Sequence, residues 1–216
     1  MSTSFELKGL YGITDSALAA GSSTAEQVAL ALDGGAKIIQ YRDKGTDDDK
    51  RAKEARDLLQ LCRQHGVPLI INDDVELASR IGADGVHLGK DDPDLEAARS
   101  RLGHEAIIGV SCYNRFELAI AAQQAGADYI AFGRFFSSSI KPDAVQADIG
   151  LLERAKEELH LPTVAIGGIT PENGGALIKA GADMLAVIHG VFGQPDIKTA
   201  CNKFNKLFKQ TEVSPT

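Results

Sequence analysis

The chain has 216 residues, an ordinary hydrophobic fraction of 44% and a formal net charge of −7, which is typical of a globular protein with one substantial core. Nucleic acids and anionic membranes are bound through an excess of lysine and arginine on one face, so this acidic balance argues against both as partners. Its three cysteines, Cys62, Cys112 and Cys201, lie far apart, which excludes a disulfide framework and a zinc site.

The N-terminus has no basic region followed by an apolar one, and no window approaches the roughly 18 apolar residues of a membrane span. We therefore expect a cytoplasmic protein with one domain over residues 1–216 and a short polar tail from about residue 211. The expected partners are small molecules, because any anion bound by this acidic chain must be small and held locally. The oligomeric state stays open, a homo-oligomer included.

One short motif recurs along the chain, each time where a helical pattern ends and an apolar run begins. Its glycines are 47, 44 and 55 residues apart, and the copies are Gly35-Ala36-Lys37, Gly82-Ala83-Asp84, Gly126-Ala127-Asp128 and Gly181-Ala182-Asp183. A glycine C-cap followed by a short loop into a strand explains this pattern.

Eight apolar runs are predicted as strands, and helix-period spacing fills segments between them. The runs begin at Leu10, Ile38, Leu69, Val86, Ile107, Tyr129, Thr163 and Met184, and the clearest helical segments are 25–32, 52–62, 118–125, 151–159 and 204–208. This alternation predicts an α/β protein, a parallel (β/α)₈ TIM barrel. A doubly wound open sheet is the alternative that periodicity leaves open, although the fourfold repeat favours closure and no G-x-G-x-x-G follows the first strand.

The third predicted strand delivers three polar residues at its carboxyl end. Its apolar run, residues 69–71, is followed by Asn72, Asp73 and Asp74. An amide and two carboxylates so close together suit Mg²⁺, which is usually held by one or two carboxylates while a substrate phosphate completes its shell. The run therefore predicts a magnesium site.

Polar residues also follow the other predicted strands, at the end of a barrel where active sites lie. They are Gln40 to Lys44, Lys90 to Asp92, Ser111, Arg134 to Asp143, Gly167-Gly168, and Ile188 to Gly190. Acidic and basic clusters together predict a site for a diphosphate bridged to Mg²⁺. In this site Arg42, Lys44 and Lys141 would bind the remaining negatively charged oxygens. A solvated rim is the alternative, but convergence on one end favours a site.

Glycines after the last two strands indicate a second anion site. Gly167-Gly168 and Gly190 fit a phosphate cradle of backbone N–H groups, although Gly167-Gly168 alone equally fits a tight turn before Pro171. The set predicts one anionic group near strands 2 to 4 and another near strands 6 to 8. The segment 134–148 has no clear period, so both a lid and a plain loop stay open.

In combination these residues resemble the thiamine phosphate synthase family over about residues 10–192. The motifs that carry the resemblance are Gln40-x-Arg42-x-Lys44, Asn72-Asp73-Asp74, Gly85 to Gly89 with Asp91-Asp92, Gly109-Val110-Ser111, Lys141-Pro142 and Ile166 to Ile169. The resemblance implies a (β/α)₈ transferase that joins hydroxymethylpyrimidine diphosphate to hydroxyethylthiazole phosphate, giving thiamine phosphate and diphosphate. It also implies that diphosphate leaves in a dissociative step before the thiazole nitrogen attacks.

The resemblance further implies a role for each matching residue. Mg²⁺ would be bound by Asp73 and Asp92. The pyrimidine diphosphate would be held by Gln40, Tyr41, Arg42, Asp43, Lys44, Asn72, Ser111 and Lys141, of which Arg42, Lys44, Ser111 and Lys141 are expected to be catalytic. The thiazole phosphate would be held by Ser138, Ser139, Ile140, Gly168, Ile188 and His189.

Some positions depart from the family pattern, and other functions stay open. Ile140 stands where threonine is usual, Arg134 and Ser137 where prolines are usual, and His189 where serine is usual. A thiazole tautomerase, a sugar-phosphate isomerase and a non-catalytic phosphate-ligand sensor are the alternatives. His87 lies within an apolar run, which favours a hydrogen-bonded interior role over catalysis.

Overall fold

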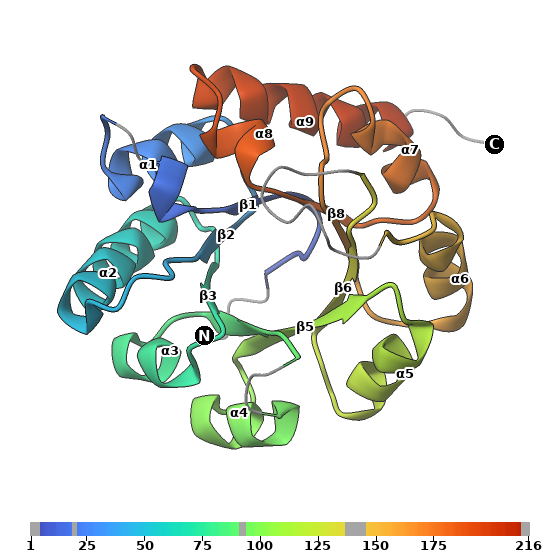
Figure 1. Ribbon diagram of the computed structural model, residues 1–216, viewed down its shortest axis with the longest axis horizontal. Coiled ribbons are helices and arrows are strands. Elements are labelled where there is room, and N and C mark those ends of the chain that lie inside the picture. The colour runs from blue at the N-terminus through green and yellow to red at the C-terminus, as the bar shows by residue number, and fades with distance from the viewer. Residues whose placement is uncertain (1–4, 19–20, 91–93, 137–145, 213–216) are drawn as a thin grey trace.

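The computed structural model describes residues 5–18, 21–90, 94–136 and 146–212, and it is a closed barrel of parallel strands surrounded by helices (Figure 1). The strands follow one another around the barrel in chain order, and the first pairs with the last to close it. The predicted (β/α)₈ barrel is therefore confirmed, and the open-sheet alternative is excluded.

Each of the eight strands lies on one of the predicted apolar runs. The strands are β1 (Gly9–Ile13), β2 (Ile38–Tyr41), β3 (Leu69–Asn72), β4 (Gly85–Leu88), β5 (Ile107–Tyr113), β6 (Tyr129–Gly133), β7 (Thr163–Ile166) and β8 (Met184–Val187). Short apolar runs became strands because closure buries them on both faces.

The helices cover the outside of the barrel (Figure 1). They are α1 (Thr24–Asp33), α2 (Asp48–Gln64), α3 (Val75–Ile81), α4 (Leu95–Leu102), α5 (Phe116–Gln124), α6 (Gly150–Glu158), α7 (Gly174–Lys179), α8 (His189–Phe192) and α9 (Ile197–Glu212), with a 3₁₀ turn η1 (Ser16–Leu18). Helix α9 extends past residue 211, where the tail was predicted to begin. None of the helices within the described ranges is long and apolar enough to cross a bilayer.

The core has two layers, because side chains of a strand alternate between the barrel interior and the helices. The interior layer contains Tyr11, Ile13, Ile38, Ile70, Tyr129, Ala131, Val164, Met184 and Ala186. A larger cluster fills the space between strands and helices. Leu7, just before β1, packs against the interior layer at the amino end of the barrel, so the opposite end is the one left for a site.

The aspartates of the recurring motif hold the amino ends of the strands together. Each side chain accepts a hydrogen bond of 2.7 to 2.8 Å from a backbone N–H at the start of the preceding strand: Asp84 from Leu69, Asp128 from Ile108 and Asp183 from Thr163. Burial raises the pKa of Asp84 and of Asp183. The motif thus combines a helix-ending glycine with a carboxylate that completes the hydrogen bonding of the sheet.

Candidate active site

A cavity of about 270 Å³ lies at the carboxyl ends of the strands, where active sites of this fold are found. Polar and glycine residues from all eight strands and the segments after them line it: Tyr11, Gln40, Arg42, Asn72, His87, Ser111, Tyr113, Gly133, Arg134, Gly167, Gly168, His189 and Gly190. Apolar residues such as Ile13, Val164 and Ile188 form the rest of its wall. A mostly preformed pocket with a few convergent polar groups is the usual form of a small-molecule site.

The cavity brings together most of the described residues that the sequence predicts for the site. Gln40, Arg42, Asn72 and Ser111 line it from β2, β3 and β5, and Gly168, Ile188 and His189 line it from the loops after β7 and β8. Residues separated by up to 149 positions along the chain, from Gln40 to His189, therefore face one space.

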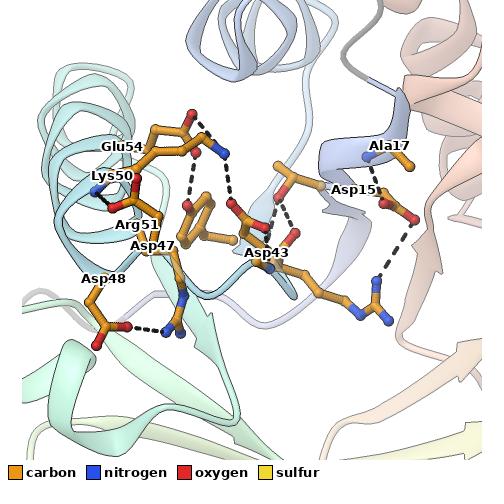
Figure 2. Close-up of polar contacts among 12 residues, drawn as sticks. Asp15, Ala17, Asp43, Asp47, Asp48, Lys50, Arg51 and Glu54 are labelled. Atoms are coloured by element: carbon orange, nitrogen blue, oxygen red, sulfur yellow. Dashed lines mark hydrogen bonds and ion pairs between the residues drawn. The ribbon is translucent and has the colours of Figure 1, made fainter.

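Tyr41 and Asp43 do not face the cavity, although the sequence analysis placed both on the pyrimidine diphosphate. The Tyr41 hydroxyl donates to Glu54 of α2 at 2.9 Å, and Asp43 accepts from Lys50 of α2 at 3.0 Å (Figure 2). The reason is strand alternation: Gln40 and Arg42 point inward, so the residues after them point toward the helices. Both side chains hold the loop after β2 against α2.

The two contacts with α2 also explain the protonation of these side chains. Burial works against the Asp43 carboxylate, but hydrogen bonds from the Gly45 N–H and from Lys50 lower its pKa overall. Burial, the hydrogen bond to Glu54 and the negative charge of that residue raise the pKa of Tyr41. The ion pair and the neutral phenol are therefore the stable forms that fix this loop.

Arg42 is oriented into the cavity by the end of β1. Its backbone N–H donates to the buried Thr14 hydroxyl at 2.9 Å, and its guanidinium lies 3.7 Å from the Asp15 carboxylate (Figure 2). The N–H of Thr14 in turn donates to the Gln40 carbonyl at 2.9 Å. These contacts join the ends of β1 and β2, so the arginine is positioned before any ligand arrives.

The two carboxylates after β3 have different surroundings. Asp74 caps α3 by accepting from the Leu77 N–H and pairs with Arg51 at 2.8 Å. Asp73 has a left-handed backbone, with φ of 63°, and its carboxylate lies 2.6 Å from the ammonium of Lys44. Asp74 thus caps helix α3, whereas Asp73 and Lys44 form an ion pair at the mouth of the barrel. A backbone strained in this way is often found at functional sites.

A chain of hydrogen bonds runs through the barrel interior along the wall of the cavity. Gln40 donates to the Tyr11 hydroxyl at 2.8 Å, the hydroxyls of Tyr11 and Tyr129 lie 2.8 Å apart, and Tyr129 lies 3.0 Å from Nδ1 of His87. Nε2 of His87 is 2.9 Å from the Ser111 hydroxyl. His87 therefore makes the hydrogen bonds within the barrel that were predicted for it, and it also lines the cavity. Burial lowers the pKa of His87 to about 4 and raises the pKa values of both tyrosines.

Several predicted site residues lie outside the residues that the structure describes, so their roles stay predictions. They are Asp92, Ser138, Ser139, Ile140 and Lys141. The question of a lid over segment 134–148 falls largely on the same residues.

Sequence reasoning missed four residues that line or support the cavity. They are Tyr11, Tyr129, Thr14 and Tyr113, the last with φ of 55°. A tyrosine within an apolar run has the pattern of an ordinary core residue, and nothing in the neighbouring sequence indicates that its hydroxyl contacts another polar group inside the barrel. The available clue was alternation, which places residues 11, 40, 87, 111 and 129 on the interior face.

Fold and site together define a class: (β/α)₈ enzymes that act on small molecules, with a cavity at the carboxyl ends of the strands. A family model described as thiamine monophosphate synthase matches residues 10–191. A thiamine-phosphate synthase of Nitrosococcus oceani is 52% identical over 205 residues, covering 95% of this chain and 94% of the relative. One of Nitrosospira multiformis is 48% identical over 214 residues, covering 98% and 90%.

The structures agree with the sequences. A thiamine phosphate pyrophosphorylase from Pyrococcus furiosus superposes with a TM-score of 0.85 at 33% identity, covering 94% of this chain and 96% of that one. The chain belongs to the thiamine monophosphate synthase family. It is an enzyme of thiamine biosynthesis, a transferase with thiamine-phosphate synthase activity. The relatives favour this activity over the tautomerase, isomerase and sensor alternatives.

Proposed function

We propose that hydroxymethylpyrimidine diphosphate and hydroxyethylthiazole phosphate meet in the cavity at the carboxyl ends of the strands. The observation that carries the proposal is that side-chain donors line one side of this cavity and glycines line the other. Arg42, Asn72 and Ser111 lie on the side of β2 to β5, and the glycines 168 and 190 lie on the side of β7 and β8. The first side suits a diphosphate, and the second suits a monophosphate held by backbone N–H groups.

Loss of diphosphate is the step for which the cavity is suited. The bond between the pyrimidine methylene carbon and the diphosphate oxygen breaks, and its electron pair leaves with the diphosphate. The resulting cation is stabilised by the electron-rich aminopyrimidine, and the lone pair of the thiazole nitrogen then forms the new carbon–nitrogen bond. Arg42, Lys44 and Lys141 counter the charge that grows on the leaving group, while Ser111 donates a hydrogen bond to it.

A strong acid or base is not required by this chemistry, and the interior histidine fits that expectation. Burial lowers the pKa of His87 to about 4, which favours a neutral imidazole at physiological pH. The proposed catalysis therefore rests on charge stabilisation and on holding the two substrates in contact.

The residues at the mouth of the cavity fit a magnesium ion shared with the substrate. Among the described residues, no three His, Cys, Asp or Glu side chains come together as a metal cluster. Asp73 supplies one carboxylate beside the cavity wall, and Asp92 is proposed as the second from the resemblance. One or two carboxylates completed by phosphate oxygens and water is the usual donor set for Mg²⁺. When bound, the ion would neutralise part of the leaving group's charge.

The remaining finer proposals concern location and partners. We propose that the enzyme acts in the cytoplasm on small-molecule substrates and without a nucleic acid partner. A net charge of −7 supports the second point, because proteins that bind a phosphate backbone usually carry an excess of lysine and arginine.

The decisive experiment is a coupled assay of both products. The protein is incubated with the two substrates and Mg²⁺, and thiamine phosphate and diphosphate are quantified in parallel, with a chelator in the control. The proposal predicts equal amounts of the two products and their loss in the control. Diphosphate release without thiamine phosphate, or no turnover with the metal present, would contradict it.

A further inference from the structure

Three neighbouring strands place the rings of His87 and Tyr129 together in the barrel interior. In the register of the sheet His87 lies opposite Gly109, and Gly109 lies opposite Tyr129. A Cβ at Gly109 would overlap the Tyr129 ring, so the glycine makes the space in which that ring lies. The two rings stack with centroids 5.6 Å apart and an interplanar angle of 22°. The contact between them is therefore built into the strands.

The one hydrogen bond of this cluster whose direction is fixed by its donor begins at Gln40. The amide nitrogen of Gln40 is a donor only, so the Tyr11 hydroxyl accepts from it. The Tyr11 proton is then available for Tyr129, 2.8 Å away, and the Tyr129 proton for Nδ1 of His87, 3.0 Å away. With Nδ1 accepting, a neutral imidazole carries its single proton on Nε2.

The end of this chain reaches the cavity. Nε2 of His87 is 2.9 Å from the Ser111 hydroxyl oxygen, and Ser111 lines the cavity. If the serine oxygen accepts from Nε2, its own proton is left for a ligand. In the reverse direction Ser111 would donate to His87 and offer a diphosphate only lone pairs, which repel it.

We infer that Tyr129 is a positioning residue that holds His87 in the Nε2-protonated tautomer and thereby makes the Ser111 hydroxyl a hydrogen-bond donor toward the cavity. The inference deepens the proposed function, since it rests on Ser111 meeting the diphosphate. The inference concerns contacts within the chain, so the tautomer can be measured without substrates. A result that contradicts the predicted tautomer can therefore be distinguished from a result that contradicts the proposed activity.

The first test is the tautomer of His87 in the unaltered enzyme at neutral pH. Nitrogen-15 NMR of the imidazole rings distinguishes a protonated from an unprotonated ring nitrogen, and the spectrum of His87→Gln identifies the signals of this residue among the five histidines. The inference predicts a protonated Nε2 and an unprotonated Nδ1. A protonated Nδ1 would overturn it, whatever the activity of the enzyme.

The second test compares two variants that each remove one buried hydroxyl and keep the ring. Tyr129→Phe removes the donor to Nδ1, so the His87 signals should move toward a mixture of tautomers and kcat should fall about tenfold, the effect of one hydrogen bond. Tyr11→Phe removes the previous hydroxyl and leaves Tyr129 to donate, so the tautomer should stay unchanged.

A double-variant cycle separates positioning from general packing. If Tyr129 acts through His87, Tyr129→Phe should lower kcat in the parent enzyme and have little further effect in a His87→Ala background. Equal losses in both backgrounds, or identical His87 spectra for the Tyr129 variant and the parent, would overturn the inference. If the Tyr129 variant does not fold, the spectrum of the parent still decides.

Discussion

The two ends of the barrel use the same residue type for different purposes. At the amino end, the carboxylates of the recurring motif each accept a backbone N–H of the sheet: Asp84, Asp128 and Asp183. At the carboxyl end, carboxylates pair with side-chain cations: Asp43 with Lys50, Asp73 with Lys44 and Asp74 with Arg51. The first arrangement completes the hydrogen bonding of the sheet. In the second, Asp43 and Asp74 hold the loops after β2 and β3 to helix α2, and Asp73 places a charged pair at the mouth of the barrel.

We therefore expect residues at the amino end of the barrel to affect stability and residues at the carboxyl end to affect activity. A carboxylate that satisfies a partly buried backbone N–H leaves an unpaired group when it is lost, which costs stability. Ion pairs between exposed side chains contribute little to stability, but they keep charged groups near the place where an anion binds. We therefore expect variants at the carboxyl end to lower turnover and variants at the amino end to lower the free energy of unfolding.

Removal of the metal should have the largest effect on turnover. Chelation of Mg²⁺ should lower kcat by about 10³-fold or more, because the leaving group then loses a metal ion worth several kcal/mol of charge stabilisation. The melting temperature should change little, since backbone and side-chain contacts hold the described fold. Turnover that persists after chelation would show that catalysis does not depend on a metal ion bound by the carboxylates at this end of the barrel.

Arg42→Ala should have the second-largest effect on turnover. Losing a preorganised cation typically costs about 3 to 4 kcal/mol in the transition state, so kcat should fall about 10²- to 10³-fold. Arg56→Ala is the matched control, because Arg56 is exposed on α2. Steady-state kinetics of both variants, with their melting temperatures, measure the contrast. Near-normal turnover of the Arg42 variant at saturating substrates would exclude this cation from the reaction.

At the amino end, Asp183→Ala should act on stability alone. It leaves the Thr163 N–H without the acceptor that now lies 2.8 Å away, so the free energy of unfolding should fall by about 1 to 3 kcal/mol. Denaturant unfolding measures this change, and kcat should stay within about twofold of the parent because the residue lies at the far end of β8 from the cavity. A large loss of kcat in a stably folded variant would contradict the separation of the two ends.

Lys50→Met should have the smallest effect, a loss of about 1 kcal/mol of unfolding free energy, because the Lys50 side chain is half exposed although that of Asp43 is only 3% exposed. The effect should depend on pH. Folding lowers the pKa of Asp43 below its ordinary 3.8, so the pair stabilises the protein fully above that value and loses its contribution as the pH falls through the lowered pKa. Unfolding curves of the variant and the parent should therefore converge in acid, and a constant gap would show that Lys50 acts by other means.

The fold was predictable because its signals are local and repeated. Apolar runs, helix-period spacing and the fourfold Gly-Ala motif each report on a few neighbouring residues, and closure follows from their alternation. The structure adds the reason for the aspartate after three of these glycines, a bond to the preceding strand. No local pattern reveals such a bond, because its acceptor and donor lie 15 to 20 residues apart.

The site was predictable in outline and less so in detail. The position of Arg42, Asn72 and Ser111 at strand ends was sufficient to place them around one cavity. Tyr41 and Asp43 were assigned to the substrate as part of a motif, although alternation turns their side chains toward α2. The chain of hydrogen bonds along the cavity wall joins residues of five strands, and only closure of the barrel brings these residues into contact.

The most direct test of the central claim is a crystal structure of the enzyme with Mg²⁺, thiamine phosphate and diphosphate. The account predicts diphosphate oxygens within about 3 Å of the Arg42 guanidinium and the Ser111 hydroxyl, with the phosphate of thiamine phosphate against Gly168 and Gly190. Products bound away from this cavity, or a diphosphate that contacts neither Arg42 nor Ser111, would contradict it.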